Sequence, residues 1–434
     1  MLTHKKLLLL PLMTLSLLAN EAQLNIDNLI EKALSSSPDI NISLNTFEIS
    51  EQRSSQADAD YLPQVDLYAG AGKVGITSYV AGTKGSQSGN LVTGKITASQ
   101  LIYDFGKTGG NMDFYSHESN ASYALYQQNI ADKINEVKHD YYDLLRKHHL
   151  IKVYNENVQL TEQQLTRAKR YFQAGIKTKI DVTDANVRLI EAKIELENSK
   201  YDLKLAYVTL DKTIGNVYDS VEGHLYIHEI DSPVGVYETL PQESMNGTEL
   251  VEFAFKNRQE LKSFDFKIQS AQSKVRQESG DYYPGLYIAG DYQYNSVEDD
   301  FQLYIPEQQW NANINLKWNL FGGMRTQAKT EEAKLSLLKE HSSLDEAKLR
   351  IVQETSNAYI NLLKTDANVK LSEELVVAAK EKFAQAQQRY EHGLSDYIEL
   401  QEARQGYINA TANLVFNYYE YYISLAALDR AIGR

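Results

Sequence analysis

The sequence predicts a mainly α-helical protein with a small, two-faced β portion, and three observations lead to this fold class. A stretch near 310–321 alternates between apolar and polar residues, as a β-strand with two different faces does. Helical patterns of about seventy residues follow the strands, well beyond the length of an ordinary globular helix. The whole layout occurs twice along the chain, which indicates a tandem structural repeat.

The strand near 310–321 places its apolar and polar residues on opposite faces, because successive side chains of a strand point in opposite directions. Such a strand fits a soluble antiparallel sheet with its apolar side inward, or a lipid-facing strand of a membrane β-barrel. The two tryptophans of the chain, Trp310 and Trp318, lie on the apolar face, roughly 26 Å apart along an extended strand. That spacing is close to the height of a barrel's apolar band with its aromatic girdles, which favours the barrel.

Composition limits the classes of protein that remain. Residues 1–19 read as a signal peptide, with Lys5 and Lys6 before an apolar core and Ala19 at a plausible cleavage point. The chain has no cysteine, so a disulfide scaffold, a thiolate nucleophile and a cysteine-based zinc site are excluded. Its net charge of −14 argues against a nucleic-acid partner. No later apolar run has the length of a membrane helix, so we expect any membrane crossing to use a closed barrel.

Two copies of one unit, 20–216 and 247–434, are joined by a linker at 217–246. The segment Leu-Asp-Lys-Thr-Ile-Gly at 210–215 matches Leu-Asp-Arg-Ala-Ile-Gly at 428–433, and Gly175 matches Gly393 at the same offset. In the linker, His224 and His228 are four residues apart, but with no helical context a loop is favoured over a metal site.

Each copy is expected to contain a first helix, two strands, a long helix and a fourth helix, in that order. The first helix, about 35 residues long, covers 25–60 and 247–281. The strands cover 65–80 and 91–105 in copy one and 286–296 and 310–321 in copy two, with a Gly- and Ser-rich turn region at 82–89 and an acidic loop at 298–300. The long helices cover 107–174 and 324–392, and the fourth helices cover 177–215 and 394–432.

The long helices carry an apolar repeat of seven residues, at Leu337, Leu344, Ile351 and Ala358, which is typical of helices packed lengthwise. Tight turns at Gly175 and Gly393 then predict antiparallel hairpins about 100 Å tall. Four strands cannot close a barrel alone, because the smallest membrane barrels need about eight. Either several chains pool their strands or the sheet does not lie in a membrane.

This layout resembles the TolC family of outer-membrane efflux and secretion channels. The resemblance covers essentially the whole mature chain and rests on the order and spacing of short motifs. These motifs are 29–38, Tyr-Leu-Pro at 61–63, Phe-Gly at 105–106 and 321–322, 170–175 with 181–185, and 389–393 with 399–403. The resemblance implies a homotrimer in the outer membrane of a Gram-negative bacterium. Four strands from each protomer would close one barrel, and the helices would form a periplasmic tunnel.

The resemblance also implies a periplasmic entrance at the hairpin turns, lined by acidic side chains. Carried over by position, these are Glu399, Glu402 and Asp396, with Asp181 and Asp184 in copy one. The alternative is that these acids only cover a solvated helix face. The candidate gate contacts are Tyr390, Lys177, Lys179 and Ser395. Relatives can carry an arginine latch where this chain has Ser395, so the latch is absent, reduced, or built from the two lysines.

The function implied by the resemblance is a passive outer-membrane export duct of a tripartite efflux or type I secretion system. Its partners would be outer-membrane lipid, a periplasmic adaptor and an inner-membrane transporter, and the transporter would choose between protein, drug and metal cargo. The sequence shows no Gly-rich phosphate loop and no metal-ligand cluster, so we expect no enzyme, cofactor or metal site. The alternative from another class is a soluble periplasmic coiled-coil scaffold or adaptor.

Overall fold

The computed structural model describes residues 25–80, 83–216, 240–297 and 305–434. The signal at 1–19, most of the linker with its two histidines, and the acidic loop at 298–300 lie outside these residues. The described chain forms two compact units. Among the described residues, one unit comprises 25–37, 133–216, 240–242 and 363–426, and the other comprises 38–80, 83–132, 243–297, 305–362 and 427–434.

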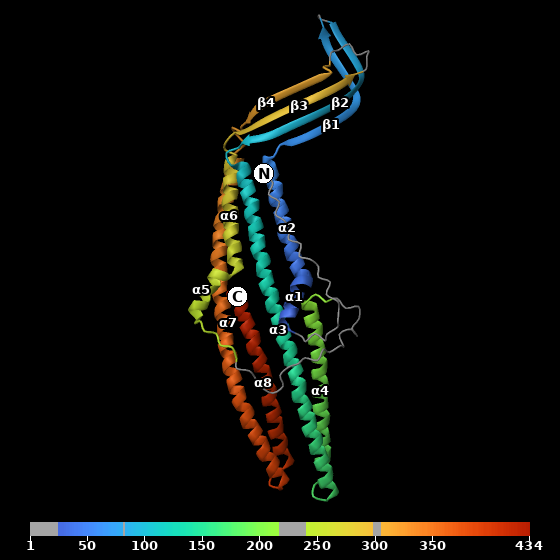
Figure 1. Ribbon diagram of the computed structural model, residues 1–434, viewed down its shortest axis with the longest axis vertical. Coiled ribbons are helices and arrows are strands. Elements are labelled where there is room, and N and C mark those ends of the chain that lie inside the picture. Colours follow the sequence, from blue (N-terminus) through green and yellow to red (C-terminus); the bar gives the residue numbers. More distant parts are fainter. Residues whose placement is uncertain (1–24, 81–82, 217–239, 298–304) are drawn as a thin grey trace, which may run out of the picture. The chain divides into compact units, whose positions relative to one another are not determined.

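The second unit contains a four-stranded antiparallel sheet (Figure 1). Its strands are β1 (Gln64–Val80), β2 (Thr83–Tyr103), β3 (Gly285–Val297) and β4 (Gln308–Lys317), in that spatial order. Strands β1 and β4 are therefore the two edges, and each copy of the repeat contributes one hairpin.

One face of the sheet is apolar and exposed. The strand register places Leu67, Ile96, Tyr292 and Trp310 in a single row across all four strands. Leu67 and Trp310 are each 75% exposed, so nothing in the described chain covers this face.

The opposite face of the sheet carries a polar network. Lys95 Nζ lies 3.7 Å from a carboxylate oxygen of Asp291 on the neighbouring strand, and Asn311 donates to that same side chain. The sheet therefore has the two chemically different faces that the alternation in its fourth strand predicts.

Two expectations about the strands are wrong. The Gly- and Ser-rich stretch at 83–90 is strand, not loop, because β1 pairs with it residue by residue through backbone hydrogen bonds that need no particular side chains. Strand β4 ends at Lys317, whereas the expected strand ran to 321. Trp318 lies beyond the strand, and its indole N–H donates to the carbonyl of Tyr282 at 3.0 Å.

Most of the rest of the described chain forms eight α-helices, and a short 3-10 helix (Ala59–Tyr61) precedes the first strand. The α-helices are α1 (Ile26–Ser36), α2 (Pro38–Asp58), α3 (Lys107–Gln173), α4 (Lys179–Thr213), α5 (Gly247–Asn257), α6 (Gln259–Gly280), α7 (Arg325–Glu391) and α8 (Tyr397–Ile432). Helices α3 and α7 have 67 residues each, or about 100 Å at 1.5 Å per residue. Among the described residues, none of the helices combines the length and the apolar character that a membrane crossing requires.

The first helix of each copy, expected to be continuous, is broken in two. In copy one the break falls at Ser37, which is extended because it precedes Pro38. In copy two no proline is present, and the break falls at Arg258. Its guanidinium is 1% exposed and bonds to Glu354 at 2.6 Å and to Glu260 at 3.0 Å. These charged hydrogen bonds hold the side chain inward where the backbone turns.

The seven-residue apolar repeat of α7 lies on or beside its buried side, because Ile351 is buried and Leu337, Leu344 and Ala358 are half-buried. Ala347, Ile351 and Leu362 are almost inaccessible to solvent. Between them the buried positions advance by four residues twice, from Ala347 to Ile351 and then to Thr355. An extra four-residue step of this kind locally relaxes a left-handed supercoil. It falls next to Glu354, the acidic partner of Arg258.

In the first unit, an aromatic cluster joins α3 and α8. Tyr419 packs on His149 with ring centroids 5.3 Å apart, and the Tyr419 hydroxyl lies 2.8 Å from His149 Nδ1. Burial, and then the charge of Lys152, lower the pKa of His149 to about 4. The folded protein therefore disfavours the charged imidazolium at this position.

This depressed pKa predicts acid sensitivity. His149 titrates near 6.5 when unfolded, so its contribution to stability is complete above that pH and is lost as the pH falls toward 4. The loss is at most about 3 kcal/mol for a shift of this size. In the variant His149→Phe, we expect the free energy of unfolding to fall less between pH 7 and pH 4. The difference between the two proteins isolates the contribution of His149, because the other titratable groups contribute equally to both. Parallel curves of unfolding free energy against pH would contradict the prediction.

Candidate functional site

The two hairpin turns of the first unit have the same backbone geometry. Gly175 and Gly393 each have φ of +72°, the left-handed region that glycine adopts without a steric penalty. At the first turn, the N–H of Ile176 donates to the carbonyl of Tyr171 at 2.9 Å. At the second turn, the N–H of Leu394 donates to the carbonyl of Arg389 at 2.8 Å. Both turns are Schellman motifs, which satisfy the last carbonyls of α3 and α7.

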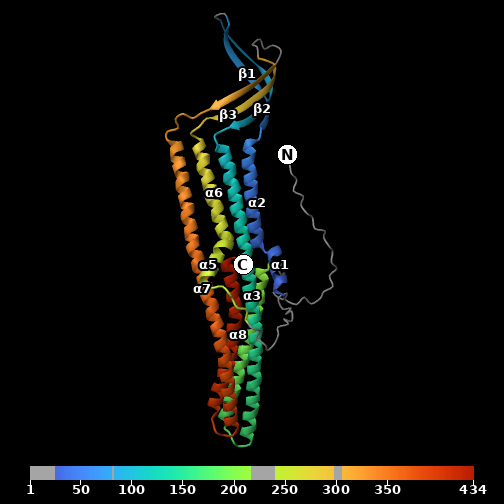
Figure 2. The same ribbon diagram turned by 60° about the vertical axis from the view of Figure 1, so that its left-hand side comes forward.

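The two hairpins share one hydrophobic core near their turns. Its buried members come from all four helices: Leu165 from α3, Leu189 from α4, Phe383 from α7 and Leu400 from α8. Both views of the ribbon show the two turns side by side at one end of this unit (Figures 1 and 2). The shared core fixes the positions of the polar residues around the turns.

Two of the five candidate acids have local structural roles. Asp181 accepts hydrogen bonds from the backbone N–H of Thr178 at 2.8 Å and from its hydroxyl at 2.7 Å, at the start of α4. Burial opposes the charge of Asp181, but the Thr178 hydrogen bonds and Lys177 outweigh it and keep the pKa of this carboxyl below its usual value. Asp396 caps α8 by accepting from the N–H of Glu399 at 2.9 Å.

The remaining three acids differ in whether their carboxylates have a partner. Glu399 Oε1 lies 3.5 Å from the guanidinium of Arg389, on the opposite side of the turn. Asp184 and Glu402 are exposed, and neither has a hydrogen bond or ion pair with the residues that the structure describes. These two acids occupy equivalent positions in the two copies of the repeat. Because they are exposed and unpaired, they are the candidate acids most available to a solute.

The candidate gate residues are only partly brought together. Tyr390 is buried between Tyr171 and Tyr397, and Lys177 Nζ lies 5.2 Å from the centre of its ring. A lysine of the first turn thus contacts an aromatic ring of the second hairpin through a cation–π interaction. Lys179 is exposed, whereas the Ser395 hydroxyl is buried without a hydrogen-bond partner in the described chain.

Two polar contacts between the hairpins did not emerge from the sequence. Arg167 on α3 donates to Glu391 on α7 at 2.6 Å, and both side chains are about one-third exposed. Deeper in the bundle, Arg404 is 2% exposed and bonds to Asn157 and Gln401. Burial lowers the pKa of Arg404. The sequence does contain a signal for Arg404. It lies four residues after Leu400, where the helical period places a residue on the same buried face.

The chain is thus a duplication with two long helical hairpins and a sheet that exposes an apolar face. The family model described as outer membrane efflux protein matches residues 29–216 and 250–434. The chain therefore belongs to the outer membrane efflux protein family.

Known relatives agree with this membership. The chain is 21% identical over 384 residues to the outer membrane protein TolC of Vibrio cholerae, covering 86% of this chain and 82% of that protein. It is 22% identical over 180 residues to the alkaline protease secretion protein AprF of Pseudomonas aeruginosa, covering 41% of this chain and 36% of AprF. The solved structure of the outer membrane protein VceC from Vibrio cholerae has a TM-score of 0.81 at 17% identity, covering 94% of this chain and 96% of VceC.

These findings confirm the predicted resemblance, the TolC-like fold class with its tandem repeat, and the outer-membrane location. They do not test the entrance residues, which stay a prediction.

The turn geometry predicts opposite effects of one substitution at two glycines. Gly393→Ala forces a side chain into the left-handed region, at a cost of roughly 1–2 kcal/mol. Hydrogen exchange at the amide of Leu394 should therefore accelerate about 5- to 30-fold. Gly406→Ala is the matched control, because Gly406 lies within α8 and nothing lies within 4 Å of an added Cβ. There alanine should stabilise the helix by about 1 kcal/mol. Equal effects at both sites would contradict the assignment.

Proposed function

We propose that the protein is a passive export duct that spans the outer membrane and serves a tripartite efflux or type I secretion system. One observation carries this proposal: the sheet exposes a complete apolar row on one face and a hydrogen-bonded polar network on the other. An apolar outer band and a polar interior are what a transmembrane barrel needs. Trp310 would lie in the aromatic girdle, and Trp318 would mark the periplasmic side just beyond the strand.

The open edges of the sheet support assembly from several copies. Strands β1 and β4 have 17 and 10 residues and no neighbour on their outer sides within the described chain. Long unpaired edges of this kind pair readily with other strands. If β1 of one chain pairs with β4 of the next chain, three chains close a ring without a free edge. This ring is the homotrimer that the family resemblance implies.

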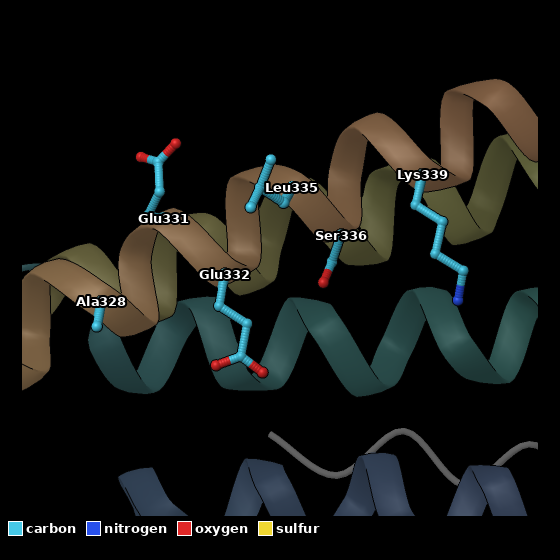
Figure 3. Close-up of a pocket in the computed structure, with 6 residues that line it drawn as sticks. All are labelled: Ala328, Glu331, Glu332, Leu335, Ser336 and Lys339. Atoms are coloured by element: carbon cyan, nitrogen blue, oxygen red, sulfur yellow. The ribbon is translucent and has the colours of Figure 1, made fainter.

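Two exposed apolar stripes on the helices support the same assembly. On α4, Ile180, Val187, Ile194, Tyr201 and Val208 recur every seven residues and are exposed. On α7, Leu338, Leu349, Ile360 and Leu371 recur every eleven residues and are exposed. Two different surfaces favour head-to-tail contacts, which close into a ring. Figure 3 shows a hollow on α7 near the start of the second stripe, around Leu335, lined by side chains of this one helix.

The hairpin turns present apolar side chains that fit a docking adaptor. The residue after each turn glycine usually packs against its own helix in a Schellman motif. Here Ile176 and Leu394 are 67% and 70% exposed. Ile180 and Ile398, at equivalent positions four residues later, are also exposed. We infer that a periplasmic adaptor covers these four residues and links the duct to an inner-membrane transporter.

The acids near the turns would line the entrance. In a symmetric ring, Glu402 and Asp184 with Glu399 would bring like charges together around the axis. Converging carboxylates attract cations and repel anions, so the closed duct would prefer cations.

Conductance and export together test this function. In planar bilayers the purified protein should form cation-selective channels, and Glu399→Gln with Glu402→Gln should lower the cation-to-anion permeability ratio severalfold. Glu331→Gln with Glu332→Gln, which removes the same charge from the hollow in Figure 3, should leave the ratio unchanged. In the cell, loss of the gene should abolish export of one class of cargo.

The outcomes separate the two parts of the proposal. Absence of conductance, together with normal efflux and secretion in the deletion strain, would overturn the export duct. Conductance with unaltered selectivity in the Glu399 and Glu402 variant would overturn only the acid-lined entrance.

A further inference from the structure

The hairpin formed by β1 and β2 extends beyond the other two strands of the sheet (Figure 1). Strand β2 pairs with β3 only as far as Leu91, whereas its pairing with β1 continues to Thr83. Residues 73–80 and 83–90, here called the free hairpin, therefore have no third strand beside them in the described chain. Because a two-stranded hairpin alone is only marginally stable in water, we expect a partner to cover part of it.

The apolar face of the sheet changes its chemistry where the free hairpin begins. On this face, the last apolar row consists of Ala71 and Val92, and the next row consists of Lys73 and Asn90. The described side chains and backbone positions above that boundary are all exposed, and they are Lys73, Gly75, Thr77, Lys84, Ser86, Ser88 and Asn90. One continuous face is therefore apolar along the sheet and polar along the free hairpin.

Aromatic side chains lie just below this boundary. Tyr292 and Trp310 share one row of the apolar face, and Tyr294 lies in the next row toward the free hairpin. Aromatic side chains of this kind concentrate where a membrane meets water. Lys73 lies two rows beyond Tyr294, or roughly 14 Å along the strands. If the apolar face lies in lipid, Lys73 is therefore at the level of the lipid headgroups.

The free hairpin is cationic and contains no acid that could compensate it. Residues 67–103 include three lysines and no Asp or Glu. Lys95 is on the opposite face of the sheet and pairs with Asp291. Lys73 and Lys84 are exposed and have no ion pair with the residues that the structure describes. A cationic face that also carries hydroxyl and amide groups, on a chain with a net charge of −14, indicates an anionic and hydroxyl-rich partner.

The spacing of the two lysines limits which lipid can reach both. Lys84 is in register with Tyr79, six residues beyond Lys73 along β1, which is roughly 20 Å. The headgroup layer of a phospholipid bilayer is only about 5–8 Å thick on each side. A phospholipid therefore reaches Lys73 alone, whereas a glycolipid with a phosphorylated oligosaccharide headgroup reaches both lysines.

We propose that the exposed polar face of the free hairpin binds the phosphorylated saccharide headgroup of lipopolysaccharide in the outer leaflet. Lys73 contacts the phosphates next to the acyl chains, and Lys84 contacts phosphates of the core saccharide. The serine, threonine and asparagine side chains between them hydrogen-bond to the sugar. This inference rests on the proposed function, because it requires the apolar face of the sheet to lie in lipid.

Native mass spectrometry of the full-length protein, delipidated in detergent, tests the site. The probes are rough lipopolysaccharide with a phosphorylated core, lipid A without the core, and phosphatidylglycerol. We expect the wild type to bind rough lipopolysaccharide at least about fivefold more tightly than either of the other two. Lys84→Gln should remove this preference over lipid A and leave the affinity for lipid A unchanged. Lys73→Gln should weaken both glycolipids by about fivefold.

Two controls separate the position of the charge from its presence. Lys73→Val with Val74→Lys exchanges two neighbours, so the net charge is kept while the cation moves to the opposite face of the hairpin. This variant should weaken binding as much as Lys73→Gln. Lys256→Gln with Lys339→Gln removes two exposed charges from α5 and α7 and should leave every affinity unchanged.

The absence of lipopolysaccharide binding would overturn the proposal. Wild-type binding of lipid A or phosphatidylglycerol as tight as that of rough lipopolysaccharide would overturn it as well, as would full binding by the exchanged variant. Conductance of the same preparation in planar bilayers separates this failure from failure of the duct. A wild type that conducts without binding loses only the lipid site, and one that binds without conducting loses only the duct.

Discussion

The whole structure depends on a sheet that one chain leaves incomplete. Its apolar row from Leu67 to Trp310 is exposed, and its edge strands β1 and β4 lack outer partners in the described chain. Burying a large apolar side chain is worth about 1.5–3 kcal/mol, so a face of such residues strongly favours an apolar environment. Lipid can cover the face, but it cannot hydrogen-bond to the edges. Only further strands satisfy the edges in lipid. The proposed membrane position and the proposed assembly of several chains therefore follow from one constraint.

The helical repeat shows how two similar backbones acquire different roles. Both hairpins turn through the same Schellman motif, yet the fourth helices bury different faces. Ile190 on α4 is 51% exposed, whereas its counterpart Ile408 on α8 is 1% exposed. Tyr201 and its counterpart Tyr419 differ in the same way, at 61% and 5%. Within one chain, α8 is therefore a core helix, whereas α4 leaves one of its faces exposed. The charges diverge as well, because Asp181 caps its own helix while Glu399 faces Arg389.

Much of this fold could be predicted from the sequence, because it follows from local periodicity. Alternation predicted the two faces of β4, and a seven-residue repeat indicated the packed side of α7. The repeated glycines predicted the two turns. The errors fall where long-range contacts decide. The glycines and serines at 83–90 look like a loop, but pairing with β1 makes them a strand. The break at Arg258 has no proline and depends on Glu260 and Glu354, of which Glu354 is distant in sequence.

Cross-linking between strand edges tests the central claim most directly. The chain contains no cysteine, so the double variant Asp66→Cys with Asn313→Cys has one reactive thiol on β1 and one on β4, both on the polar face. Treatment of the detergent-purified protein with a short bismaleimide should give covalent species of one, two and three chains and nothing larger, because a closed ring ends at three. Exclusively monomeric products, or a ladder that continues beyond three chains, would contradict the account.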